Sequence, residues 1–256
     1  MKYFCLLLTA VFFLTSCTVP TDGSVSVPIL MYHDFTSDET SGNAFTIPAS
    51  CFEEHLTALE EAGYRSVTFA ELIDYVCFGG KLPEKPVLIT SDDGYTSVPG
   101  IAALIAARHG MTISCAVIGS LSGVNGHFSF DTPLPANLEI VSHTYALHDR
   151  SGWNGMVTDD VWLYEPILEK DCAEMRNFCA ERFPMTEWVL IYPHGHYSAE
   201  SERILHAQGV RVTVTCDPGI AQLRRGDAES LYLLPRISVW PGMTAADVLA
   251  RAEGKW

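Results

Sequence analysis

Residues 86–95 read Pro-Val-Leu-Ile-Thr-Ser-Asp-Asp-Gly-Tyr, an apolar run that ends in two adjacent carboxylates and a glycine. The run predicts a buried strand, and Gly94 permits a sharp turn after it. Burying two unpaired charges costs several kcal/mol unless a cation or another partner compensates. The stretch therefore indicates a metal or polar centre at the end of a core strand, although Asp-Asp-Gly alone more often forms a turn that caps a helix.

Short apolar strands alternate with helices along the rest of the chain. We expect strands at 28–32, 65–68, 87–90, 112–118, 138–141, 189–192, 210–215 and 231–239. We expect helices from Ser50, with a capping box to Glu53, and at 69–76, 101–109, 160–182, 199–208 and 245–251. This alternation predicts a mostly parallel sheet. The number of strand–helix units favours an α/β fold with the architecture of a distorted (β/α) barrel of about seven strands. We expect it to form a single domain over 28–256.

Three histidines follow expected strands, as the two carboxylates do. His143 and His148 are five residues apart, so a loop can fold both rings onto one ion. His33 follows the first strand and can reach the same rim, because catalytic groups of α/β barrels come from the carboxyl ends of strands. Alone, each of these histidines is more often an ordinary hydrogen-bonded residue. Together with Asp92 and Asp93 they predict a metal-dependent hydrolase.

The bulk composition narrows the class of protein. The chain has 256 residues, of which 48% are hydrophobic and 18% charged, so it can fill a sizeable core. Its formal net charge of −15, without clustered lysine or arginine, argues against a nucleic-acid partner. We read the excess of acidic residues as a solvated surface.

The first 27 residues indicate export rather than folding. Lys2 precedes the apolar stretch 3–14, which is too short for a stable membrane span but suits a signal peptide. The sequence Leu-Thr-Ser-Cys at 14–17 resembles a bacterial lipobox, in which the cysteine is lipidated. We expect a signal peptide at 1–16, a lipidated polar tether at 17–27, and a location in the bacterial cell envelope. An ordinary secretory signal is the alternative.

Export also bears on the cysteines. Of 8 in the chain, Cys5 would leave with the signal and Cys17 would be acylated. The others are Cys51, Cys77, Cys115, Cys172, Cys179 and Cys216. An even number permits disulfides in an exported protein. Cys172 and Cys179 lie about 10 Å apart along one helix, too far to bridge each other. We expect Cys115 and Cys216 to be buried free thiols.

The chain resembles the polysaccharide deacetylases of the NodB-homology class, also called carbohydrate esterase family four. The first family motif, Thr-Phe-Asp-Asp-Gly, matches residues 90–94, with serine in place of the aromatic residue. The second, Ser-His-Thr with a later histidine, matches 142–148. The third, an aromatic-Pro-aromatic-Gly turn, matches 192–195, with His194 for an aromatic residue. The likeness covers about 28–239.

Two details resemble one branch of that family, which acts on β-1,6-linked poly-N-acetylglucosamine. They are the five-residue histidine spacing and the Tyr-His pair at 32–33. The resemblance implies an N-acetylated polysaccharide substrate outside the cell. It also implies that Asp93, His143 and His148 hold a divalent metal. Zinc suits two histidines and one carboxylate with an open position, while cobalt, nickel or iron would also fit.

The resemblance further implies three catalytic roles. Asp92 would act as the base toward the attacking water. The backbone N–H of His194 would stabilise the oxyanion, and His33 would protonate the departing amine.

Two further departures from the family pattern concern this site. Ser91 replaces an aromatic residue and should loosen packing behind the carboxylates. The arginine that many members carry before the third motif is missing, and Arg236 is a candidate to orient Asp92 instead. Several aromatic residues are candidates for stacking on sugars, although each is more often a core residue. They are Tyr32, Tyr95, Tyr145, Tyr192, Tyr197 and Trp240.

The leading hypothesis is a lipid-anchored, metal-dependent N-deacetylase. An O-acetyl esterase acting on a glycan such as acetylxylan would use the same residues on another leaving group. A non-catalytic surface protein that binds glycans is the alternative from another class. The presence of Asp92, Asp93, His143 and His148 argues against it. A serine hydrolase is disfavoured because the chain contains no Gly-x-Ser-x-Gly.

Overall fold

The computed structural model describes residues 23–38, 43–124, 126–148, 161–183 and 187–256. The expected signal peptide, Cys17 and most of the expected tether therefore lie outside the described residues, as does Asp160 at the expected start of a helix.

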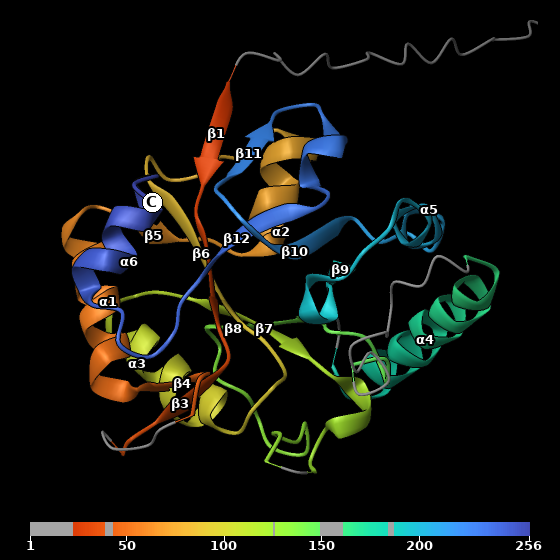
Figure 1. Cartoon of the computed structure of the whole chain (residues 1–256), viewed down its shortest axis with the longest axis horizontal. Coiled ribbons are helices and arrows are strands. Elements are labelled where there is room, and N and C mark those ends of the chain that lie inside the picture. Colours follow the sequence, from red (N-terminus) through yellow and green to blue (C-terminus); the bar gives the residue numbers. More distant parts are fainter. Residues whose placement is uncertain (1–22, 39–42, 125, 149–160, 184–186) are drawn as a thin grey trace, which may run out of the picture.

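Seven parallel strands close into a barrel, which confirms the predicted architecture (Figure 1). In order around the barrel they are β2 (Ile29–Tyr32), β12 (Leu234–Ser238), β10 (Val212–Pro218), β9 (Val189–Ile191), β8 (Leu138–Ser142), β7 (Ile113–Val117) and β6 (Pro86–Ser91). β6 pairs again with β2 and so completes the ring. A short strand, β5 (Arg65–Ser66), pairs with the start of β6.

The barrel is distorted at two seams. β8 and β9 are aligned at one residue pair, Ser142 with Leu190. The register of β10 against β12 shifts between Val214 and Pro218. The seam between β8 and β9 matters for function because the predicted metal ligand His143 follows β8 directly.

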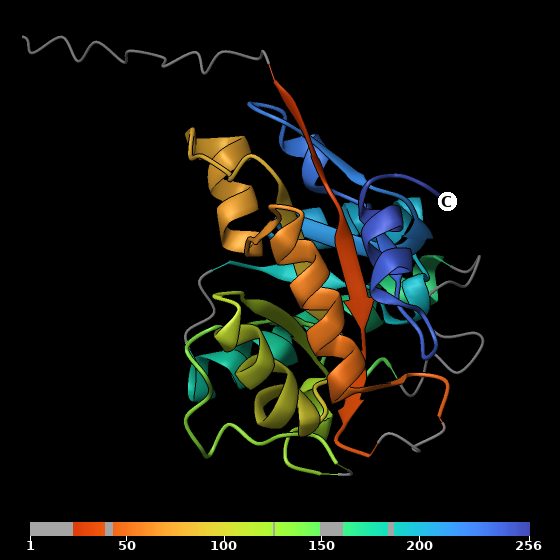
Figure 2. The same ribbon diagram turned by 90° about the vertical axis from the view of Figure 1, so that its left-hand side faces the viewer.

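Helices cover the outside of the barrel, with α1, α3 and α6 on one side and α4 and α5 on the other (Figures 1 and 2). Their bounds are α1 (Ala49–Glu61), α2 (Phe69–Ile73), α3 (Ala103–Arg108), α4 (Val161–Arg182), α5 (Ala199–Ala207) and α6 (Ala245–Ala252). π-helical turns at Asp74–Phe78 and Val98–Ala102 adjoin α2 and α3, and short 3₁₀ turns lie at Gly119–Leu121, Pro193–Gly195 and Ala228–Leu231. All six residues of β6 are buried, as expected of a parallel strand packed on both faces.

The start of α1 differs from the prediction. The helix begins at Ala49, directly after Pro48, and no side chain caps its first turn, so the predicted capping box from Ser50 to Glu53 is wrong. The reason is that β4 (Thr46–Pro48) pairs with β3 (Asp34–Thr36) and runs into the helix without a break. Ser50 therefore already lies inside the first helical turn.

The chain also enters the domain earlier than expected. Residues 24–27, assigned to the tether from sequence, form β1 (Ser24–Val27), which pairs antiparallel with β11 (Ala221–Arg224). Val27 is fully buried. The alternating Ser-Val-Ser-Val pattern has the period of a half-buried strand, so residues 24–27 belong to the folded domain and not to the expected tether.

The barrel has two distinct ends. β1 and β11 lie at the amino-terminal end of the parallel strands, whereas β3 and β4 lie at the carboxyl-terminal end (Figure 1). Within the described part of the chain, no helix has the length and apolar character needed to cross a membrane.

The six cysteines within the described residues are free thiols. Cys115 is fully buried as predicted, and burial raises the pKa of its thiol. Cys216 is less enclosed than predicted, because it lies near the carboxyl end of β10 and lines a pocket there.

Candidate metal centre and catalytic pocket

A pocket of about 420 Å³ opens at the carboxyl-terminal end of the barrel. Its lining contains all six residues predicted for the site, namely His33, Asp92, Asp93, His143, His148 and His194. Met31, Asp34, Asn43, Phe45, Tyr95 and Cys216 complete the wall. The six predicted residues come from four separate stretches of sequence, which meet because parallel strands place their carboxyl ends at one edge.

Asp93, His143 and His148 form a compact set of potential metal ligands. The Asp93 Oδ1 atom lies 3.5 Å from His143 Nε2 and 3.3 Å from His148 Nε2. One ligand atom from each residue lies within 4.8 Å of the other two. This is the spacing expected of three atoms that share one cation.

The chemistry of this set also fits a cation. Asp93 Oδ1 is buried and has no hydrogen-bond donor. An acceptor buried without a partner costs about 1–3 kcal/mol, more when it is charged. A cation placed between the carboxylate and the two imidazoles would remove that cost, so the residues fit the divalent metal that the sequence predicts.

The orientation of His143 is set by a backbone group across the seam between β8 and β9. Its Nδ1 lies 2.8 Å from the carbonyl oxygen of Ile191, which can only accept a hydrogen bond. Nδ1 therefore carries the proton, and the Nε2 lone pair faces Asp93. Burial lowers the pKa of His143 to about 4, which keeps the ring neutral and able to bind a metal.

A tight turn after β6 sends the two adjacent carboxylates to different partners. Asp93 has a φ of 73° and Gly94 a φ of 85°, so two consecutive residues lie in the left-handed region. This conformation is unusual for a residue other than glycine and marks local strain. Asp93 points toward the histidines, and Tyr95 forms a hydrogen bond to its carboxylate.

Asp92 is held instead by Arg236 on β12. Arg236 Nη1 and Nη2 donate to Asp92 Oδ1 and Oδ2, each at 2.8 Å, and both side chains are buried. Burial acts to raise the pKa of Asp92, but the guanidinium prevails and holds that pKa well below its usual range. Arg236 Nε donates to the Thr215 carbonyl at 2.8 Å, which fixes the orientation of the guanidinium group. Arg236 is thus the guanidinium partner that the third motif lacks.

Ser91 does not loosen the site, contrary to the prediction. Its side chain is fully buried, and its hydroxyl donates to the His33 carbonyl at 2.7 Å. This bond ties the end of β6 to the residue after β2. The small polar residue therefore links two of the segments that carry site residues.

His33 and His194 line the same pocket as the candidate metal ligands. The His33 ring packs against Phe45 with ring centroids 5.1 Å apart. His194 lies in the turn Pro193–Gly195 with a φ of 55°, and its ring centroid is 4.7 Å from that of His148. Gly195 is required there, because a Cβ would lie 2.7 Å from the Cys216 backbone nitrogen.

The aromatic residues proposed to stack on sugars are only partly supported. Tyr95 lines the pocket, but Tyr32 and Tyr192 are fully buried and cannot meet a substrate. Trp240 lies against Arg251 beside a different cavity. Phe45, which sequence reasoning missed, lines the pocket with 59% of its surface exposed. Its segment carries no local pattern that would have indicated this position.

Comparisons with known proteins agree with this geometry. No family model matches the chain. A Bacillus subtilis protein named "Putative polysaccharide deacetylase YxkH" is 29% identical over 235 residues, which cover 91% of this chain and 78% of that protein. The predicted resemblance to the polysaccharide deacetylases is thereby confirmed at the level of sequence.

Solved structures confirm the fold. The Streptococcus pyogenes deacetylase PplD, solved in complex with acetate, superposes with a TM-score of 0.74 at 18% identity, over 90% of this chain and 99% of that one. IcaB from Ammonifex degensii gives a TM-score of 0.71 at 22% identity, over 89% and 97% of the two chains.

Proposed function

We propose that this chain, like the relatives named as polysaccharide deacetylases, is a metal-dependent hydrolase, and that it removes N-acetyl groups from polysaccharides containing N-acetylglucosamine. The observation that carries the proposal is that two adjacent carboxylates have different partners. Asp93 lies with His143 and His148 as a set of ligands, while Asp92 is held apart by Arg236. A bound divalent cation supplies Lewis acidity and makes water nucleophilic near neutral pH.

Asp92 is suited to accept the proton of the attacking water. Each carboxylate oxygen has two lone pairs, and Arg236 uses one on each, so capacity for another hydrogen bond remains. The pairing with Arg236 keeps the carboxylate ionised. It also fixes the direction in which the carboxylate faces the pocket, which a general base requires.

His33 is suited to return a proton to the departing amine. It lines the same pocket from the end of β2, next to the end of β6 where Asp92 lies. An amine leaves readily only when it is protonated, so an acid at this edge would complete the reaction. The backbone N–H of His194 would stabilise the charge that develops on the acetyl oxygen.

The substrate and location follow from other features. The exposed ring of Phe45 and the ring of Tyr95 both line the pocket and offer apolar surface for a pyranose ring. The lipobox-like residues 14–17 support export, cleavage after residue 16 and a lipid on Cys17. We infer an enzyme of the bacterial cell envelope that acts on an extracytoplasmic glycan with zinc as its metal.

The test is acetate release from β-1,6- and β-1,4-linked N-acetylglucosamine oligomers and from acetylated xylan. We expect release from the amide substrates to stop with a chelator and to fall about 10²–10⁴-fold in Asp92→Asn. Asp131→Asn, an exposed carboxylate bonded to Ser129, is the matched control and should keep full activity. Activity that survives both treatments would contradict the mechanism, and release from xylan alone would identify an O-acetyl esterase.

A further inference from the structure

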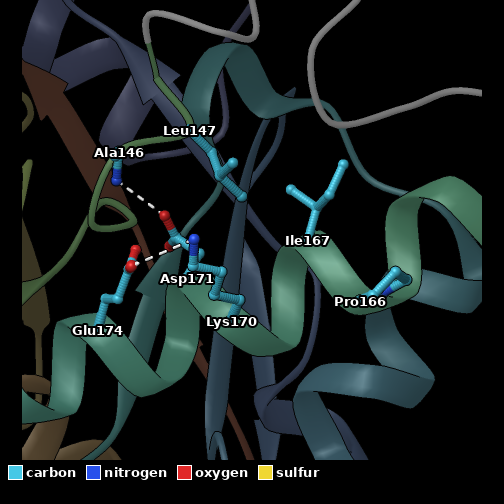
Figure 3. A pocket seen from close by; sticks show the side chains of 7 residues that line it. All are labelled: Ala146, Leu147, Pro166, Ile167, Lys170, Asp171 and Glu174. Atoms are coloured by element: carbon cyan, nitrogen blue, oxygen red, sulfur yellow. Dashed lines mark hydrogen bonds and ion pairs between the residues drawn. The ribbon is translucent and has the colours of Figure 1, made fainter.

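The segment between the two metal-binding histidines is held by a carboxylate from a distant helix. Asp171 lies on α4 and is 4% exposed. Its Oδ2 accepts from the Tyr145 backbone N–H and its Oδ1 from the Ala146 backbone N–H, each at 2.8 Å. Figure 3 shows the bond to Ala146 and the neighbouring ion pair of Lys170 with Glu174.

The backbone of this segment needs such a partner. Thr144 is a β-branched residue with a φ of 69°, a conformation that is strained without glycine. This turn aims two consecutive amides at one point, where an anion can accept from both. On the opposite side, Gly119 and Ser120 donate their backbone N–H groups to the Thr144 and Tyr145 carbonyls, at 3.2 and 2.7 Å.

Side-chain packing holds the residues on either side of Ala146. The Tyr145 ring lies against Phe178 of α4, with ring centroids 6.2 Å apart, and Leu147 belongs to a buried cluster that includes Leu168 and Cys172 of α4. Ala146 and Leu147 also border a cavity of about 380 Å³ beside α4 (Figure 3). At the edge of this cavity, the Asp171 carboxylate holds the backbone amides of Tyr145 and Ala146.

Burial opposes the charge on Asp171. It raises the pKa of the side chain to about 6, although the two backbone amides act to lower it. Both hydrogen bonds that Asp171 makes among the described residues go to the segment that joins the two imidazoles.

We propose that Asp171 is a positioning residue for the metal centre, which holds residues 144–147 so that His143 and His148 both present Nε2 to Asp93. The consequence is that Asp171 sets the affinity for the divalent cation without touching it. This inference rests on the proposed metal site but not on the identity of the substrate.

The chain provides a matched control at the other end of β8. Glu139 also receives two consecutive backbone amides, from Phe69 at 3.0 Å and Ala70 at 3.2 Å, and it is bonded to Ser114 as well. It holds the start of α2, far along the strand from the histidines. Glu139→Gln therefore removes the same kind of interaction without touching the metal centre.

The experiment measures the Kd for Zn²⁺, by competition with a chromogenic chelator, in wild type, Asp171→Asn and Glu139→Gln, together with thermal unfolding of each. Second-layer partners of metal ligands typically change affinity 10–100-fold. We expect a loss of that size in Asp171→Asn, because one amide oxygen cannot replace two carboxylate oxygens. Glu139→Gln should unfold at a lower temperature but bind Zn²⁺ within twofold of wild type.

Three results would overturn the inference: a wild-type Kd in Asp171→Asn, an equal loss in Glu139→Gln, or no Zn²⁺ binding by wild type. If Asp171→Asn does not fold, Asp171→Glu takes its place, since it keeps the charge but moves it by one methylene. We expect at least a tenfold loss there, and an unchanged Kd would again overturn the inference. Tight binding by wild type without acetate release would refute the proposed function alone.

Discussion

Replacing Arg236 with methionine would show how much free energy it costs to bury the Asp92 carboxylate without a partner. Methionine has a similar length but carries neither charge nor donors. The change removes two bonds of 2.8 Å to Asp92 and leaves its carboxylate buried without a countercharge. Breaking one side of a buried ion pair typically costs about 3–5 kcal/mol, so we expect a loss of that size in the free energy of unfolding at pH 7.5.

The loss should depend on pH in a defined direction. In wild type the pKa of Asp92 lies below its unfolded value of about 3.9, so the pair stabilises the protein above that value and the benefit disappears as pH falls through the folded pKa. In Arg236→Met, burial becomes the dominant influence and raises the pKa. That carboxylate then destabilises the protein as pH rises. The difference between wild type and variant should therefore be widest near neutral pH and shrink toward pH 4.

Urea unfolding of the metal-free proteins at pH 7.5 and 5 measures this difference. The double variant Asp92→Asn/Arg236→Met removes both partners and should regain at least half of the lost stability, because no buried charge remains. The reasoning would be refuted if the free energy of unfolding of Arg236→Met lay within 1 kcal/mol of the wild-type value at pH 7.5. It would also be refuted if the loss of stability were the same at both pH values.

Three further predictions concern the pocket. Zn²⁺ at about 100 times its Kd should stabilise the protein by about 2.7 kcal/mol and raise its Tm by about 5–10 °C in a thermal scan, and a chelator should reverse the rise. His33→Ala should slow acetate release from amides by about 10²–10⁴-fold but from an acetate ester by less, and equal losses would speak against its role as the acid. Gly195→Ala should cost about 1–3 kcal/mol in urea unfolding, because its Cβ would meet the Cys216 backbone at a φ of 69°, and wild-type stability would contradict that contact.

The architecture and the candidate metal ligands could be predicted from sequence because both depend on local patterns. Apolar runs mark the strands, and parallel strands bring their carboxyl ends together, so Asp93, His143 and His148 lie close to one another as expected. Their binding of a metal stays a prediction. The roles of Asp92 and His33 in the reaction stay predictions.

Residues that act through long-range contacts were harder to identify. Arg236 lies 144 positions from Asp92, and only the closure of the barrel through β12 and β2 brings them together. Asp171 follows an ordinary helical pattern and gains its partners from the fold. β1 was missed because its alternation of serine and valine reads equally well as a polar linker when the partner strand is unknown.

The placement of β1 has a bearing on how the molecule would sit on a cell. The described chain begins with β1 at the amino-terminal end of the barrel strands (Figure 1), and the pocket that contains Asp92 and Asp93 lies at their carboxyl-terminal end. Six residues lie between Cys17 and Ser24, so the distance from Cys17 to Ser24 is at most about 25 Å when the chain is fully extended. With a lipid on Cys17, as proposed, the domain would lie close to the bilayer. Its pocket would then face away from the membrane and would be accessible to polysaccharide strands rather than to lipid headgroups.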